Sequence, residues 1–125
     1  MFQPLHAVSC DPHRNLIRIT LSGLFTVADV DAFRRDLIAR HAELTCPPNQ
    51  HVSLCQLTSM KIQPQEVVAA FAAVAAYRPC QSRRMTIILG RSLTRLQLER
   101  VFDRNTVRIL SEEAQGEAWL LTDED

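Results

Sequence analysis

The residues best able to perform chemistry in this chain are its cysteines and histidines, four of each. Zinc sites use about four nitrogen or sulfur ligands, which usually come in closely spaced pairs. Cys10 and His13 come near such a pair, but they fall in a predicted turn. His41, Cys46 and His51 are evenly spaced without forming a tight pair. We therefore expect no metal site.

Catalytic and nucleotide-binding motifs are absent from the sequence. A serine or cysteine nucleophile needs a nearby base and an oxyanion hole, and the chain holds no G-x-S-x-G elbow. A phosphate-binding loop or a dinucleotide fingerprint needs clustered glycines. The three glycines are instead scattered at Gly23, Gly90 and Gly116. These observations predict a protein that is not an enzyme and has no cofactor.

One segment has the composition of an anion site. Gly90 is followed by Arg91 and Ser92 where a predicted strand meets a predicted helix, and Arg95 comes one turn later. A helix N-terminus beside arginines can hold a phosphate or carboxylate. The candidate anion site is therefore Arg91, Ser92 and Arg95. The alternative is a plain, tight connection between the two elements.

The charges balance overall but are unevenly placed. The 125 residues include 14 basic and 14 acidic side chains. Residues 78–108 carry eight arginines against two acids, and residues 109–125 carry six acids and no base. Such blocks indicate either a phosphate-seeking patch or neutralisation within the molecule. The isoelectric point of about 6.9 is far from that of nucleic-acid binders, so no nucleic-acid partner is expected.

Composition and the N-terminal sequence predict a cytoplasmic protein of one domain. The chain is 46% hydrophobic and 22% charged, which is typical of soluble globular proteins. Residues 1–4 lack the basic and apolar regions of a signal peptide. The longest mainly apolar uncharged stretch, Val67–Tyr77, is too short to span a bilayer, so no stable membrane insertion is expected. We expect a single domain over 1–125, with an acidic tail at 121–125, and reduced thiols.

Hydrophobic spacing and turn signals predict strands alternating with helices. Strands are expected at 5–10, 16–21, 51–57, 85–89 and 106–110, and the first two form an antiparallel hairpin. Helices are expected at 27–43, at 64–77, from Ser92 or Thr94 onward, and after a Ser111 cap. This order predicts an α/β domain with a mixed, mostly parallel sheet of about five strands and about four helices.

Several local strings support a family resemblance across nearly the whole chain. They are Leu21-Ser22-Gly23, Thr26-Val27-Ala28-Asp29, Val107–Ala114 and Ala118-Trp119-Leu120. In this order the chain resembles the SpoIIAA-like family, within the STAS (anti-anti-sigma-factor) fold. The resemblance implies a regulatory protein that binds other proteins. Because the group also resembles CRAL-TRIO lipid carriers in fold, it implies a second possibility, a carrier or sensor of a small apolar ligand or lipid.

The sequence departs from that family at its phosphorylation site. Anti-anti-sigma factors carry a phosphorylatable serine in an Asp-Ser-Ser-Gly string, where the third strand meets the next helix. The matching segment here is Ile62–Glu66, which contains no hydroxyl group. Thr58 and Ser59 lie a few residues earlier. We therefore expect no phosphoserine switch of the family's kind.

The alanine-rich helix is the most informative element. No charge occurs in the eleven residues after Glu66, whereas a surface helix normally has a charged outer side. A second subunit, a partner protein or an apolar ligand could cover it; alternatively, its small alanines simply tolerate exposure. The predicted partner- or ligand-binding surface consists of Gln63, Gln65, Val68, Phe71, Ala72 and Ala76. The leading hypothesis is a non-catalytic interaction module, which forms a homodimer or binds another protein.

Overall fold

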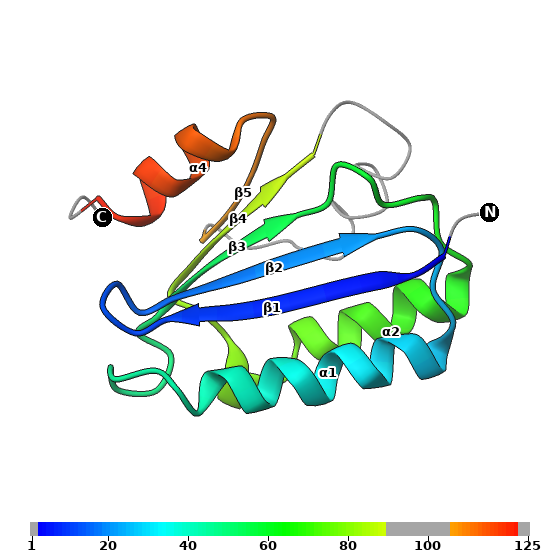
Figure 1. Ribbon diagram of the computed structural model, residues 1–125, viewed down its shortest axis with the longest axis horizontal. Coiled ribbons are helices and arrows are strands. Elements are labelled where there is room, and N and C mark those ends of the chain that lie inside the picture. The colour runs from blue at the N-terminus through cyan, green and yellow to red at the C-terminus, as the bar shows by residue number, and fades with distance from the viewer. Residues whose placement is uncertain (1–2, 90–105, 123–125) are drawn as a thin grey trace.

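A five-stranded sheet forms the centre of the molecule (Figure 1). The computed structural model describes residues 3–89 and 106–122. The strands are β1 (Leu5–Asp11), β2 (Leu16–Ser22), β3 (Val52–Gln56), β4 (Arg84–Ile88) and β5 (Val107–Leu110). They lie in the order β1-β2-β3-β4-β5, with β1 and β2 antiparallel and every other pair parallel. The predicted mixed, mostly parallel sheet with an N-terminal hairpin is confirmed.

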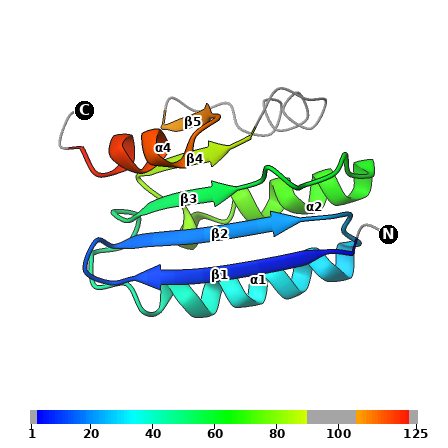
Figure 2. The ribbon, with the colours of Figure 1, turned by 45° about the horizontal axis from the view of Figure 1, so that its top comes forward.

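Helices cover both faces of the sheet. In Figures 1 and 2, α1 (Val27–His41) and α2 (Gln65–Ala75) lie on one face and α4 (Glu113–Leu120) lies on the other. A short 3-10 helix, η1 (Arg78–Cys80), follows α2. Among the described residues there are thus three α-helices, and none has the length and apolar run needed to cross a membrane. The helix predicted from Ser92 or Thr94 onward lies outside the described residues.

The helix α1 begins where its sequence predicts. The Thr26 hydroxyl accepts a hydrogen bond from the Asp29 backbone N–H at 3.2 Å, and the Asp29 carboxylate accepts one from the Thr26 N–H at 2.8 Å. This reciprocal pair satisfies two backbone donors that the first helical turn leaves unpaired. These hydrogen bonds also hold the pKa of Asp29 below its usual value.

The first residues of α2 and α4 differ from those predicted. Pro64 occupies the N-cap of α2, so that helix starts at Gln65. Its last residue is Ala75, and Pro79 lies within the 3-10 turn that follows. The predicted Ser111 cap of α4 is wrong, since Glu112 is the N-cap and no side chain bonds to the first turn.

Strand alternation divides the core into two layers. The larger layer lies between the sheet and helices α1 and α2, and includes Ile17, Ile19 and Ile87. The smaller layer, which includes Leu54 and Ile88, packs against Leu120 of α4. The central strands are therefore buried on both faces, which explains the continuous apolar run predicted as strand 85–89.

Close backbone approach brings α4 onto β4. A Cβ atom at Gly116 would lie 2.5 Å from Cγ2 of Thr86, so no larger residue fits there without movement. The Thr86 hydroxyl donates to the Gly116 carbonyl at 3.3 Å. Nearby, the Arg84 guanidinium donates to the Trp119 carbonyl at 3.0 Å and lies over the Trp119 ring. The helix is thus anchored to the sheet by shape and by hydrogen bonds.

Candidate functional site

The loops that precede α1 and α2 are tied together by the side chain of Gln63. Its Oε1 accepts a hydrogen bond from the Phe25 N–H at 2.9 Å. Its Nε2 donates to the carbonyl oxygens of Gly23 at 2.9 Å and Lys61 at 2.6 Å. Gly23 adopts a φ of 87°, which suits glycine, and it forms an isolated bridge with Met60.

Gln63 is consequently not part of the outer surface. The residue is only 6% exposed. Its buried amide is bonded to the loop backbone and so has partners that replace water. The sequence prediction placed Gln63 on the binding surface with Gln65. The structure buries Gln63 beneath that surface and leaves Gln65 exposed. Gln63 is therefore a positioning residue for the two loops.

The remaining predicted surface residues fall on two sides of α2. Phe71 faces inward and contacts the rings of Phe25 and Phe33 edge-on or tilted. Val67 is the one residue of α2 (Gln65–Ala75) that is fully buried. We define the outer face of α2 as the half-buried Val68 and Ala72 with the exposed alanines beside them, Ala69, Ala73 and Ala76.

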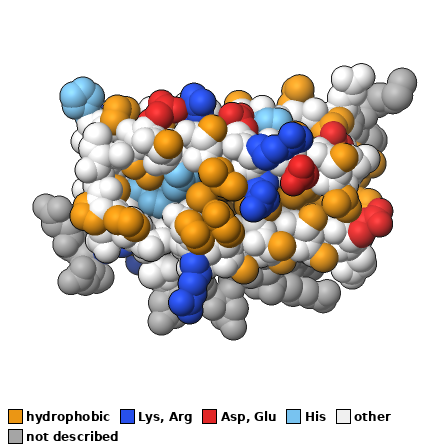
Figure 3. Space-filling model, turned by 90° about the horizontal axis from the view of Figure 1, so that it is seen from below, with side chains coloured by type: hydrophobic (Ala, Val, Ile, Leu, Met, Phe, Trp, Pro, Cys, Tyr) orange, Lys and Arg blue, Asp and Glu red, His pale blue; other side chains and the backbone are white. Residues whose placement is uncertain are grey.

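Hydrophobic side chains also protrude at the start of α1 and α2. Leu24 is 41% exposed, Val27 is 49% exposed and Ile62 is 48% exposed. We call these three residues the loop cluster. The two loops lie side by side, since the Lys61 N–H donates to the Gly23 carbonyl at 3.1 Å. Figure 3 shows hydrophobic side chains gathered over the face of the molecule formed by α1 and α2.

A cavity of about 90 Å³ lies under α2, between the two helices and the sheet. Phe33 and Leu37 of α1 line it, as do Phe71 and Val74 of α2. The sheet and its loops contribute further residues, mainly apolar, and the segment after α2 contributes a cysteine and two polar residues. The lining residues from the sheet and its loops are Ile19, Leu21, Ser53, Cys55, Leu57, Met60, Met85 and Ile87, and those near η1 are Cys80, Gln81 and Ser82.

Two histidines meet at the polar end of this cavity. His41 Nδ1 lies 2.8 Å from the Leu37 carbonyl oxygen, so this nitrogen carries a proton and donates it to that oxygen. Its Nε2 lies 3.0 Å from His51 Nε2, so one proton is shared between these two nitrogens. Burial, helped by nearby His41, lowers the pKa of His51 to about 4. His51 is therefore neutral at pH 7.

His41 and His51 were both weighed as metal ligands in the sequence analysis. Two imidazoles that share one proton have no free lone pair between them for a cation. Among the described residues, no group of three His, Cys, Asp or Glu side chains could hold a metal ion. The predicted anion-site residues Arg91, Ser92 and Arg95 lie outside the described residues.

The thiols that line the cavity are poorly suited to nucleophilic chemistry. Complete burial raises the pKa of Cys55 to about 12, and burial also raises that of Cys80. A thiol reacts as its thiolate, which is scarce when the pKa is raised. The arrangement around the cavity is therefore suited to binding rather than to covalent catalysis.

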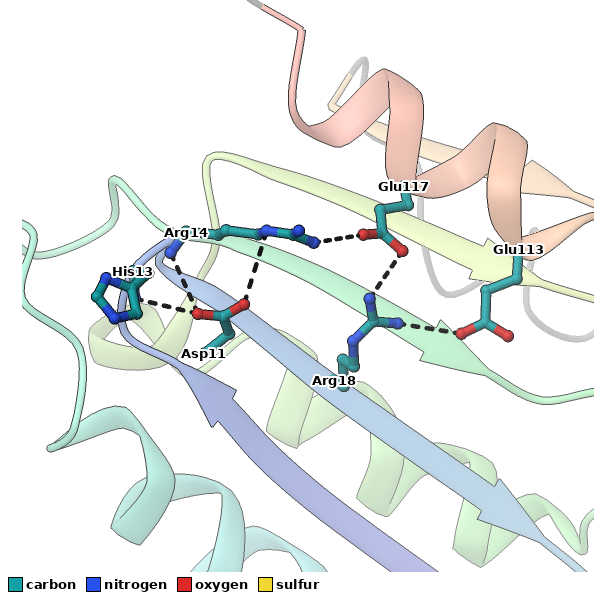
Figure 4. Close-up of polar contacts among 6 residues, drawn as sticks. All are labelled: Asp11, His13, Arg14, Arg18, Glu113 and Glu117. Carbon is teal, nitrogen blue, oxygen red and sulfur yellow. Dashed lines mark hydrogen bonds and ion pairs between the residues drawn. The ribbon is translucent and has the colours of Figure 1, made fainter.

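On the opposite side of the sheet, charged residues pair with each other (Figure 4). Glu117 of α4 accepts hydrogen bonds from Arg14 at 2.8 Å and Arg18 at 2.7 Å. Arg18 also bonds to Glu113 at 3.1 Å. The Arg18 hydrogen bond is the main reason that the pKa of Glu117 is lowered. These acids of the C-terminal block are neutralised within the molecule, by arginines of the first hairpin.

Comparison with solved structures identifies the architecture. The fold matches that of an uncharacterised protein of the DUF3478 family from Shewanella loihica PV-4, described as having a SpoIIAA-like fold, with a TM-score of 0.71 at 15% identity over 96% of this chain and 98% of that one. This chain has the SpoIIAA-like fold. An anti-sigma factor antagonist from Mycobacterium paratuberculosis matches with a TM-score of 0.60 at 13% identity, over 94% of each chain. No family model and no curated protein sequence matches.

Within this SpoIIAA-like fold, the predicted departure from the phosphorylation motif can be placed. The segment Ile62–Glu66 leads from the loop after β3 into the first turn of α2. Thr58 and Ser59 lie in the same loop and are exposed. The Thr58 hydroxyl donates to the side-chain oxygen of Gln56. The loop therefore presents hydroxyl groups before, and not at, the start of α2.

Proposed function

We propose that this SpoIIAA-like chain is a non-catalytic, regulatory protein-interaction module that docks a partner protein, or a second copy of itself, on the outer face of α2. The observation that carries the proposal is a helix face without charge that the monomer leaves uncovered. Apolar faces of this kind usually mark sites of association. The shared fold with an anti-sigma factor antagonist supports a regulatory role.

The area of a stable interface indicates which residues the partner must cover. Specific interfaces bury about 800 Å² on each side, more than five small side chains can supply. The partner must therefore also cover the loop cluster of Leu24, Val27 and Ile62. Each Å² of apolar surface removed from water contributes about 25 cal/mol before the cost of association. The Gln63 amide keeps the loop cluster and α2 in a fixed relation.

Regulation would then depend on whether the face is occupied and not on a phosphoserine at the start of α2. No side chain of Ile62–Glu66 can accept a phosphoryl group at a hydroxyl. The two outward alternatives, Thr58 and Ser59, precede the helix. The module is thus proposed to act without the family's phosphorylation switch.

Ala72→Glu tests the docking face. The charge would have to be desolvated on docking, so we expect association to weaken by tenfold or more, while the monomer stays folded because Ala72 is only half-buried. Light scattering at high concentration measures self-association. Affinity purification from the native host, with mass spectrometry, measures partner binding. Ala118→Glu is the matched control, since Ala118 is an exposed alanine of α4 on the other side of the sheet.

A partner that Ala72→Glu loses and Ala118→Glu retains supports the proposal. Equal binding by the two variants would contradict it, and so would a wild type that stays monomeric and captures nothing. Circular dichroism and an amide NMR spectrum of each variant separate loss of docking from loss of folding.

A second function, carriage of a small apolar ligand, is supported by the cavity under α2. The cavity lies beneath the alanine-rich helix and is lined mainly by apolar residues. Native mass spectrometry of protein purified from its own host tests this function. A co-purifying apolar molecule favours the carrier, whereas the mass of the bare chain counts against it.

A further inference from the structure

Ser82 has a buried hydroxyl group for which the described residues provide no hydrogen-bonding partner. The residue lies between η1 and β4 and is 7% exposed. Within the described part of the chain, nothing bonds to its Oγ. Buried hydroxyl groups are normally paired, because an unpaired one has lost its hydrogen bonds to water without replacement. This atom therefore indicates a polar group that residues 3–89 and 106–122 do not supply.

The position of Ser82 connects that missing group with the cavity. Ser82 lines the cavity together with three other polar residues, His41, Ser53 and Gln81, while the rest of the described lining is apolar or carries a thiol. An engineered apolar cavity of about 150 Å³ binds benzene. The 90 Å³ here would hold roughly four non-hydrogen atoms before any movement. Because α2 has a single fully buried residue, a small outward shift of α2 would make more room.

The electrostatics of the cavity disfavour a charged ligand. Among its described lining residues there is no Lys, Arg, Asp or Glu. The ring nitrogens of His41 are already engaged, Nδ1 with Leu37 and Nε2 with His51. An anionic headgroup buried against these described residues would have no cationic side chain to pair with, which is strongly unfavourable.

We propose that the cavity takes a neutral, largely apolar molecule that carries one hydroxyl or carbonyl group, and that this group forms a hydrogen bond with Ser82 Oγ. The inference rests on the proposed carrier function and names its ligand class. The hydrocarbon part lies among Phe33, Phe71 and Val74, and the polar end lies against Ser82. A phospholipid with its charged headgroup buried does not fit this site.

The test compares 1-pentanol, n-pentane and pentanoate as probes of wild type and Ser82→Ala at pH 8, by titration of amide NMR spectra in sealed tubes. Loss of one hydrogen bond should weaken pentanol binding by roughly two- to tenfold in Ser82→Ala. Pentane binding should be unchanged or tighter. Pentanoate should bind wild type at least tenfold more weakly than pentanol. Ser82→Ala removes an unpaired group, so it should fold at least as stably as wild type.

The outcomes separate the ligand class from the carrier function. If both neutral probes bind but Ser82→Ala weakens them equally or not at all, the ligand class is overturned and the carrier function stands. If pentanoate binds as well as pentanol, the ligand class is also overturned. If neither neutral probe shifts the amides around the cavity at millimolar concentration, both proposals fail. Ala75→Leu, which fills the cavity from α2, should abolish binding of both neutral probes; retained binding would overturn the assigned site.

Discussion

Replacement of Gln63 by alanine is the sharpest test of how the candidate docking surface is supported. The variant removes, among the contacts of this side chain, the hydrogen bonds to Phe25, Gly23 and Lys61. A typical intramolecular hydrogen bond contributes about 0.5–1.5 kcal/mol net. The expected loss of stability is therefore about 3 kcal/mol. For a domain of this size, about 1 kcal/mol corresponds to roughly 4 °C, so the melting temperature should fall by about 12 °C.

The matched control is Gln65→Ala, two residues later. Gln65 is exposed at the first position of α2, and a surface substitution of this kind changes stability by less than about 0.5 kcal/mol. Urea unfolding, followed by circular dichroism, gives the free energy of unfolding of both variants. Gln63→Glu adds a further check, because a carboxylate still accepts from Phe25 but cannot donate to the carbonyls of Gly23 and Lys61.

The result that would refute this reasoning is a Gln63→Ala variant as stable as Gln65→Ala. That outcome would mean that the loop backbone finds water or other partners at no cost. A Gln63→Glu variant as stable as wild type at pH 7 would likewise contradict the donor role of the amide. In either case the loop cluster would no longer be held in place relative to α2 by Gln63.

Three further predictions concern packing and pH. Gly116→Val should destabilise the fold by roughly 2–3 kcal/mol through its clash with Thr86, and a variant as stable as wild type by urea unfolding would disprove that contact. Because the pKa of Glu117 is lowered in the folded state, Glu117→Gln should cost about 1 kcal/mol at pH 7. That difference should disappear as the pH falls through the lowered pKa; a difference constant with pH would contradict the ion pairs. The pKa of His51 falls from 6.5 to about 4 on folding, so the unfolded state binds more protons between these values. Wild-type stability should therefore drop as the pH falls through that window, by up to about 1.4 kcal/mol per unit, and urea unfolding of His51→Gln across the same window should show a shallower dependence; equal slopes would disprove the assignment.

Local signals were sufficient to predict the strands and the α-helices that the structure describes. The Thr26 and Asp29 pair marks the start of α1 because capping involves residues three apart. In β2, apolar residues alternate along much of the strand because most of them face the layer of α1 and α2. In β4 they are continuous because both faces of that strand are covered. Ser111 did not indicate the N-cap of α4 correctly, because a serine hydroxyl near a helix start can bond to several different backbone groups.

The candidate site was less predictable because its contacts join distant parts of the chain. A glutamine beside an exposed helix normally faces water, and nothing local to Gln63 reveals its bonds to residues about forty positions earlier. Ser82 and the cavity likewise have no periodic signature, since several elements contribute to the lining. Arg18 and Glu117 pair across 99 positions, so the uneven charge blocks could not indicate which groups neutralise each other.

The strand order also has a consequence for biosynthesis. Among the five described strands, each strand after β1 lies beside the strand that precedes it in the chain, so none of these five must insert between two others. As the ribosome releases the polypeptide, β1 and β2 can pair first, and β3, β4 and β5 can then be added one at a time to the growing edge. Until the next strand emerges, that edge carries unpaired backbone groups and is open to pairing with another nascent chain. The yield of folded protein should therefore depend on translation rate and on chaperone access, although the first hairpin can form early.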